Sequence, residues 1–539
     1  MKISIKKSTL ERVQVWAEKH YTAIVVVFLS LISVAAFVVY LNNELGIAYN
    51  DARSHLDIGR RVVEGLKPGL AQLGSVWLPL NHLLMVPTIW IDWMWYSGAA
   101  GAIQSMVSFV LTGVLITKIL EKLNVGLLGK TIAVLLFVLN INILYLQSTA
   151  MTELLLLFTM TAGCYYLILW SSDNKMLHLL SSAFFVMLST LVRYDGWFLL
   201  AFAAGIVALI TYMKSDYRKT EGTIVFYSTL GGIGIVLWFL WNQLIFSDPL
   251  YFAFGPFSAH AQQTQLSEAG ELDSKYNLLL SLKIYIYAVL YNSYTVPALL
   301  ALLGLFNLLS NKAISIYVKL ASLSLVSPFI FNVLAMFLGF SVLFVQGISG
   351  DTWFNVRYGI MLAPAISVLV GYLINKVPYK VTIVGILMFV TLISFSVNDA
   401  VTIDDARVGS SQKNVSEVSG WLADNAKDEK GFILISAASH DAIIFSSGIP
   451  MKRYIHEGTG AYWQSATTSP DKWARWIVLR THDNNDLTFR LIKDTVGFER
   501  YNLVDSYPFA DIYELKDEYV GSLITEPVFG KNADLKKVK

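Results

Sequence analysis

The chain has 539 residues, of which 55% are hydrophobic and only 15% are charged. Soluble domains carry roughly 25% charged residues, so this composition excludes an ordinary soluble protein and indicates a polytopic membrane protein. A formal charge of +2 gives no argument for nucleic-acid binding, and the single cysteine, Cys164, excludes an intrachain disulfide and a cysteine-rich metal site.

Apolar runs predict about eleven membrane spans, since roughly 20 helical residues cross a bilayer. The first span, 21–41, follows a basic N-terminus that resembles the start of a signal peptide. Its apolar run is too long for such a peptide and no small-residue cleavage site follows, so we expect a retained helix. The other spans are expected at 99–120, 130–147, 152–170, 176–192, 196–213, 223–246, 295–310, 314–340, 358–375 and 381–398.

Basic residues occupy alternate short loops between these spans, and this pattern predicts which side is cytoplasmic. They are Lys2, Lys6, Lys7, Arg12 and Lys19 before the first span, and Lys118, Lys122, Lys130, Lys175, Lys214, Arg218, Lys219, Lys312, Lys376 and Lys380 after it. We therefore expect a plasma-membrane protein with a cytoplasmic N-terminus. The outer loops 42–98, 247–294 and 341–357 are longer than the cytoplasmic ones, and long loops often carry function.

From about residue 399 the composition changes to that of a soluble domain. Short apolar runs predict strands at 431–436, 476–480, 499–505 and 509–515, with helices at 411–426 and 485–496. The sequence thus predicts a polytopic α-helical membrane domain, 1–398, that includes the first outer loop. An extracytoplasmic α/β domain, 399–520, and a tail, 521–539, are expected to follow it.

The first outer loop opens with a dense cluster of charge directly after the first span. If this cluster is helical, Arg53, Asp57 and Arg61 lie on one stripe and can neutralise one another. Asp51 and His55 point away from that stripe. A solvated interfacial helix is the plain alternative, but the cluster joins an aromatic-rich loop on the side of several other charged residues. We therefore select Asp51 as the catalytic candidate and His55 as a substrate-binding candidate.

Other charged residues stand at the outer ends of predicted spans. Glu153 opens the fourth span, where a carboxylate is also favoured simply by the helix dipole. Arg193 and Asp195 flank Tyr194 at an outer turn, which an Arg–Asp pair could merely close. Arg357 and Tyr358 enter the tenth span, where an arginine could also extend to the membrane surface. We select these residues as substrate-binding candidates.

His260, in the second long outer loop, is a further substrate-binding candidate, although a lone histidine there is more often ordinary surface. The sequence contains no Walker A, GxSxG or HExxH motif and no recognised pattern of metal ligands. We therefore predict no cofactor, with a divalent metal left open.

The chain resembles the GT-C superfamily of membrane glycosyltransferases in four features. These are an Asp just after the first span, an aromatic loop, an acidic residue that opens the fourth span, and the Arg-Tyr pairs. The likeness covers about residues 10–398 and is greatest to the protein O-mannosyltransferase and aminoarabinose transferase branch. It implies sugar transfer from a polyprenyl-phosphate donor to an acceptor glycan, lipid or protein, with Asp51 matching the first-loop catalytic carboxylate. Many relatives place a second acid beside it, whereas Ala52 follows here. Whether Asp51 acts alone or with Asp57 or Glu153 is therefore open.

Physical reasoning agrees with this function. Nucleotide sugars are cytoplasmic, and the expected cytoplasmic loops are too short to form a nucleotide-binding domain, so an outward-facing enzyme needs a lipid-linked donor. A basic group must stabilise the leaving phosphate, and Arg357 and Arg193 are the candidates. A carboxylate, Asp51, must deprotonate the acceptor hydroxyl. One base and a single displacement would invert the anomeric configuration.

Three other functions remain open. A transporter or lipid flippase would also have many spans and intramembrane charges, but would not obviously need long outer loops and an appended domain. A non-catalytic scaffold or receptor would not need charged groups at the ends of several spans. An oligosaccharyltransferase that moves a whole glycan would be expected to use a divalent metal.

Overall fold

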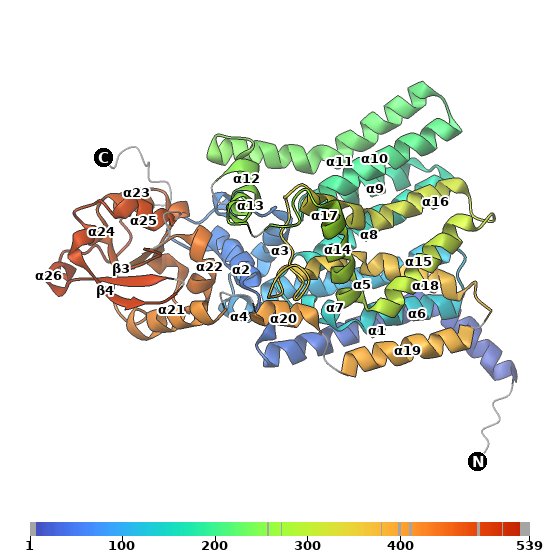
Figure 1. Cartoon of the computed structure of the whole chain (residues 1–539), viewed down its shortest axis with the longest axis horizontal. Helices are drawn as coiled ribbons and strands as arrows, with labels where there is room; N and C mark the ends of the chain where they lie inside the picture. Colours follow the sequence, from blue (N-terminus) through green and yellow to red (C-terminus); the bar gives the residue numbers. More distant parts are fainter. Residues whose placement is uncertain are drawn as a thin grey trace, which may run out of the picture. The chain divides into compact units, whose positions relative to one another are not determined.

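The computed structural model describes residues 7–255, 258–270, 272–378, 380–396, 400–408, 412–481, 486–508 and 510–528 (Figure 1). Its internal packing divides the chain into two compact units. The membrane unit comprises residues 1–45 and 102–405, and the α/β unit comprises residues 46–101 and 406–539.

The membrane unit is built from helices, most of them apolar, because a helix satisfies every backbone group of a segment inside a bilayer. They are α1 (Lys7–Asn42), α5 (Ala99–Lys122), α6 (Leu127–Val138), α7 (Ile141–Leu146), α8 (Glu153–Asp173), α9 (Met176–Thr190), α10 (Asp195–Lys214), α11 (Tyr217–Phe246), α12 (Tyr251–Phe254), α13 (Ala259–Glu268), α14 (Leu278–Ser293), α15 (Thr295–Ser310), α16 (Ile316–Ser322), η3 (Leu323–Val326), α17 (Ser327–Phe337), η4 (Val356–Leu362), α18 (Ala363–Ile374), α19 (Lys380–Ser396) and α20 (Val401–Val408).

Seven helices of the described chain are long and apolar enough to cross a membrane, and a bent pair would make eight. They are Val15–Asn42, Ala99–Lys122, Glu153–Asp173, Asp195–Lys214, Tyr217–Phe246, Ile316–Phe337 and Val356–Ile374. In the bent pair, α14 and α15 meet at 110° where Tyr294 has a φ of 62°. This finding agrees with a polytopic membrane protein.

The expected count of eleven spans is not confirmed. The predicted spans at 130–147, 176–192 and 381–398 coincide with α6, α9 and α19, which are apolar but shorter than 18 residues. The prediction of an outer loop over 247–294 is wrong for its last part, because the apolar helix α14 occupies those residues. Of the basic residues used for orientation, Lys2 and Lys6 lie outside the described residues.

The α/β unit combines four helical segments of the first outer loop with the C-terminal residues, drawn in orange and red in Figure 1. The loop supplies α2 (Asn50–Val63), η2 (Leu70–Leu73), α3 (Leu80–Ile89) and α4 (Asp92–Tyr96), after η1 (Leu45–Ile47). The C-terminal residues supply α21 (Gln412–Asn425), β1 (Phe432–Ile435), α22 (Ala437–Ser446), η5 (Met451–Arg453), β2 (Tyr454–Ile455), η6 (Glu457–Thr459), α23 (Ala461–Thr468), α24 (Pro470–Trp473), β3 (Ala474–Leu479), α25 (Leu487–Ile492), η7 (Phe498–Arg500), β4 (Tyr501–Ser506), β5 (Asp511–Leu515) and α26 (Asp517–Val520).

One five-stranded sheet, in the order β2-β1-β3-β5-β4, forms the centre of this unit. β1 pairs in parallel with β2 and β3, whereas β5 is antiparallel to β3 and β4. All four residues of β1 are buried, because helices cover parallel strands on both faces. The four predicted strands and both predicted helices are confirmed, while the two-residue strand β2 was not predicted.

The first outer loop packs into the core of the α/β unit. Leu66 belongs to the same buried apolar cluster as Phe432 and Leu434 of β1. The side-chain amide of Gln72 donates to the carbonyl of Gly458 at 2.8 Å. These contacts explain why residues 46–101 group with the C-terminal residues. The boundaries 1–398, 399–520 and 521–539 stay predictions, and residues 529–539 lie outside the described residues.

Candidate functional site

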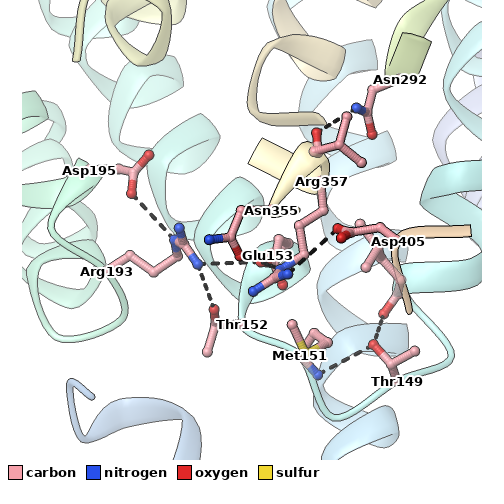
Figure 2. A network of polar contacts seen from close by, with 12 residues as sticks. Thr149, Met151, Thr152, Glu153, Arg193, Asp195, Asn292, Asn355, Arg357 and Asp405 are labelled. Atoms are coloured by element: carbon pink, nitrogen blue, oxygen red, sulfur yellow. Dashed lines mark hydrogen bonds and ion pairs between the residues drawn. The ribbon is translucent and has the colours of Figure 1, made fainter. Parts of the chain in front are cut away.

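A buried carboxylate, Glu153, is held by two arginines of the membrane unit (Figure 2). It lies in the first turn of α8 and is fully buried. Its Oε1 accepts from Arg193 Nη1 at 3.3 Å and from Arg357 Nε at 3.1 Å. Arg193 Nη1 also donates to the hydroxyl of Thr152 at 3.4 Å. Among the described residues, Glu153 Oε2 has no hydrogen-bond partner.

Two further carboxylates complete this network. Arg193 Nε lies 3.3 Å from Asp195 Oδ2, and Arg357 Nη1 lies 3.7 Å from Asp405 Oδ2. The amide of Asn332 donates to Asp195 Oδ1 at 3.4 Å. Three carboxylates therefore surround two guanidinium groups. Buried charges persist only when they are paired in this way, since unpaired ones are costly in low dielectric.

The ring of Tyr358 lies against both guanidinium groups. Its centroid is 4.4 Å from Cζ of Arg193 and 5.4 Å from Cζ of Arg357, distances suited to cation–π attraction. The two arginines differ in exposure: 19% of the Arg193 side chain is accessible, against 6% for Arg357. Arg193 is thus the member of the pair that keeps access to solvent or to a ligand.

The helical segment η4 carries Arg357 and is fixed by close contact with α14. The side-chain amide of Asn292 donates to the Val356 carbonyl at 2.7 Å and to the Ala288 carbonyl at 2.8 Å. A Cβ atom on Gly359 would overlap with the backbone of Ala288. The absence of a side chain at Gly359 therefore allows η4 to approach α14 and sets the position of Arg357.

We predict that Gly359→Ala destabilises the membrane unit by about 1–3 kcal/mol, as overpacking does in tight contacts. The matched control is Gly385→Ala in α19, where a Cβ atom would meet no atom within 4 Å. Thermal unfolding of both variants in the same detergent measures the difference. Equal melting temperatures for the two variants would contradict the proposed contact.

Asp51, the catalytic candidate, lies in the first turn of α2 in the α/β unit and is half-buried. A carboxylate is favoured there by the helix dipole. The predicted helix over this charged cluster is confirmed. Arg61 forms its ion pair with Asp441 of α22, which was not predicted, while its charge also acts on Asp57 as expected. The carboxylate of Asp57 accepts from the indole of Trp95 at 3.1 Å.

The remaining candidates, His55 and His260, have other contacts. His55 is buried within the α/β unit, where its Nδ1 lies 2.9 Å from Nε2 of His82, and Trp77 packs against its ring. Burial lowers the pKa of His82, and the neighbouring His55 and Arg61 lower it further. His260 is exposed on α13 of the membrane unit, with its ring centroid 5.6 Å from that of Phe254.

Sequence reasoning missed several members of these groups. Asp405 was assigned by composition to a soluble domain, although its carboxylate faces Arg357 in the membrane unit. Asn292, His82 and Asp441 showed no sequence signal, because their partners are distant along the chain. In the part of the chain that the structure describes, no three His, Cys, Asp or Glu side chains are grouped as metal ligands.

The buried Asp57 carboxyl predicts a pH-dependent stability of the α/β unit. Burial raises its pKa, and the Asp441 carboxylate raises the pKa further, while Arg61 and Trp95 oppose both effects. An acid with a raised folded-state pKa stabilises the fold at low pH, and this contribution is lost as the pH rises through that pKa. Each unit of pKa difference corresponds to about 1.4 kcal/mol.

We therefore expect Asp57→Asn to melt at a higher temperature than the wild type at pH 8, by about 2–4 °C for each kcal/mol. The gain should become smaller as the pH is lowered, because a raised pKa lets the wild-type carboxyl regain its proton before an exposed carboxyl would. Melting curves of both proteins at pH 5, 6.5 and 8 measure this. A temperature difference that does not change with pH would contradict a raised pKa of Asp57.

Comparisons with known proteins identify the fold. No protein-family model matches the sequence, and no curated protein matches it. ArnT from Cupriavidus metallidurans bound to undecaprenyl phosphate matches with a TM-score of 0.55 and 10% identity, over 90% of this chain and 98% of that chain. The same protein in its apo state matches over the same shares, with 10% identity and a TM-score of 0.52.

The archaeal oligosaccharyltransferase AglB from Archaeoglobus fulgidus, in complex with an inhibitory peptide and a dolichol-phosphate, is a more distant match. Its TM-score is 0.47 at 10% identity, over 86% of this chain and 70% of that chain. The likeness to ArnT, an aminoarabinose transferase, confirms the predicted resemblance. The chain has the fold of the GT-C membrane glycosyltransferases.

Proposed function

We propose that the protein is an integral-membrane glycosyltransferase that moves a sugar from a polyprenyl-phosphate donor to an acceptor hydroxyl. One observation carries the proposal: the fold likeness to ArnT spans 90% of this chain and 98% of that chain. The matched ArnT structure was solved with undecaprenyl phosphate bound, which supports a donor of the same chemical class. The transferred sugar is a hexose or a pentose, and the acceptor is a glycan, lipid or protein.

Asp51 is proposed as the general base. It would take the proton from the acceptor hydroxyl as the oxygen attacks the anomeric carbon and the bond to the lipid phosphate breaks. The electron pair of that bond leaves with the phosphate. One displacement with one base inverts the anomeric configuration. The half-buried position of Asp51 in the first turn of α2 is compatible with access to a substrate.

Arg193 is proposed to stabilise the charge that develops on the leaving phosphate, and Arg357 to hold Glu153. The difference in exposure supports this division, because the Arg193 side chain is 19% accessible and that of Arg357 is 6% accessible. A positioned guanidinium group is a strong stabiliser of a phosphate dianion, since it offers paired donors. Tyr358 would keep both guanidinium planes in place.

The α/β unit is proposed to face the extracytoplasmic side of the plasma membrane, with the N-terminus in the cytoplasm. The alternation of basic loops supports this orientation. A donor anchored in the membrane by its polyprenyl chain would then reach the enzyme without passing through the cytoplasm. No nucleic acid takes part in this function.

The test is a transfer assay with purified protein in detergent. The probes are radiolabelled undecaprenyl-phosphate hexoses and pentoses and, in parallel, the corresponding nucleotide sugars, each with a mixture of lipid and glycan acceptors. We expect release of label from a lipid-linked sugar and none from any nucleotide sugar. A chelator should leave the rate unchanged. Release of label from nucleotide sugars alone would refute the proposed donor class.

A further inference from the structure

The helix that carries Asp51 is anchored to the C-terminal part of the chain at its opposite end. Asp51 lies in the first turn of α2 and Arg61 lies in the last. Arg61 is ten positions after Asp51, which is about 15 Å along a helix with a rise of 1.5 Å per residue. Any displacement of Arg61 along the axis or around it is therefore transmitted to Asp51 by the rigid helix.

Arg61 is held by a two-pronged ion pair. Its Nη1 and Nη2 donate to Oδ1 and Oδ2 of Asp441, the second at 3.2 Å, and each side chain is only 9% exposed. A guanidinium group that donates two parallel bonds to a carboxylate fixes both distance and orientation. The pair therefore constrains the rotation of α2 as well as its position.

The Asp441 end of this link is itself fixed to the central sheet. Asp441 lies on α22, which begins directly after β1. The carboxylate of Glu457, after β2, accepts from the backbone N–H groups of Ala437 and Ala438 at 2.9 and 2.6 Å. The first turn of α22 is thus tied to two neighbouring strands. Between this turn and Asp441, the backbone of His440 is not helical (φ −134°, ψ 24°), but the buried His440 side chain is held by Asp486 at 3.2 Å. Asp441 therefore follows a second fixed point.

The energetics of buried ion pairs indicate that the Arg61–Asp441 pair fixes the position of α2 more than it stabilises the fold. Replacing such a pair by apolar residues of similar volume is often neutral or stabilising, whereas removing one partner is strongly destabilising. Apolar contacts also hold α2, since Ala52 and Leu56 are fully buried, but such contacts are not directional. The ion pair adds the directional constraint that they lack.

We propose that Asp441 is a positioning residue of the transferase: through Arg61 it sets the location and rotation of α2, and so of the Asp51 carboxylate. This inference rests on the proposed function only in taking Asp51 as the base. A base displaced by about 1 Å can lose roughly 100-fold in rate, so the link should affect turnover more than substrate binding. The appended C-terminal residues then take part in sugar transfer by orienting its base.

The main test uses the double variant Arg61→Met/Asp441→Leu, which removes both charges of the ion pair together. We expect a melting temperature close to that of the wild type, a kcat about 10- to 100-fold lower and a KM within twofold, with the radiolabelled undecaprenyl-phosphate sugar that the wild type uses. Hydrogen–deuterium exchange should be faster in residues 50–63 and unchanged in the sheet. The single variant Asp441→Glu keeps a carboxylate that can pair with Arg61. Its kcat should therefore lie between that of the double variant and that of the wild type.

The matched control is Asp471→Asn. Asp471 lies in the same unit and pairs at 2.7 Å with Arg500, which is not part of α2, so this variant should keep wild-type kcat and wild-type exchange in residues 50–63. A double variant with wild-type kcat and wild-type exchange in α2 overturns the inference. Faster exchange throughout the unit, with a lowered melting temperature, also overturns it, because the role would then be general stability.

The two proposals fail in different ways. If the wild type releases no label from any donor, the proposed function fails, and exchange alone then tests the Arg61–Asp441 link. Faster exchange confined to α2 would still support the link, and unchanged exchange would refute it. If the wild type is active and the double variant equals it, only the positioning role is lost.

Discussion

Asp51→Asn is expected to lower the rate of sugar transfer by about 100-fold or more, the lower end of what general bases contribute. The amide has almost the same size as the carboxylate but cannot accept the proton of the acceptor hydroxyl. The KM for the lipid-linked donor should change little, since Asp51 is proposed to act on the acceptor. Initial rates with a radiolabelled undecaprenyl-phosphate sugar measure both quantities.

The matched control is Asp517→Asn. Asp517 also lies in the first turn of a helix of the α/β unit, α26, but is exposed. Both substitutions remove one carboxylate from a helix N-terminus, which costs about 0.3–1 kcal/mol in each case. A general loss of stability would therefore affect both variants. Equal activity of Asp51→Asn and the wild type would remove Asp51 from the mechanism.

Arg357→Met is expected to destabilise the membrane unit by about 3–5 kcal/mol, because it takes one cation from buried Asp405 and leaves buried Glu153 with Arg193 alone. Arg357 contacts Glu153 and Asp405, and all three side chains are at most 6% exposed. Thermal unfolding in detergent, followed by tryptophan fluorescence, measures the loss. The double variant Arg357→Met/Glu153→Gln also removes the charge of Glu153. It should therefore recover part of the lost stability.

Arg218→Met serves as the control, since Arg218 is an exposed residue of α11. Substitutions of this kind usually change stability by no more than about 0.5 kcal/mol. If Arg357→Met melts like Arg218→Met, the buried network contributes nothing to stability. If the double variant melts below the single one, the charge on Glu153 stabilises the fold without Arg357.

Local sequence patterns predicted the elements and part of the charged network. Helical spacing predicted α2, and short apolar runs predicted four of the five strands. The membrane unit brings together Glu153, Arg193, Asp195, Arg357 and Tyr358, all of which the sequence had marked at the outer ends of spans. Charge is so costly in hydrocarbon that its few occurrences near spans are informative.

Pairing between distant segments could not be predicted. The stripe of Arg53, Asp57 and Arg61 was expected to neutralise itself, because only local partners are visible in a sequence. Arg61 instead pairs with Asp441, and Arg357 with Asp405. The number of spans also depends on tertiary structure, since a positive φ at Tyr294 divides one apolar run into two helices at 110°.

The most direct test of the central claim follows the sugar in proteoliposomes that contain a radiolabelled undecaprenyl-phosphate sugar and an acceptor mixture. A transferase moves label from the lipid phosphate to an acceptor, whereas a flippase moves the intact labelled lipid from one leaflet to the other. We predict that the wild type converts lipid-phosphate label into acceptor-bound label and that Asp51→Asn does so about 100-fold more slowly. Label that changes leaflet and stays on the lipid phosphate, equally in both proteins, would contradict the claim.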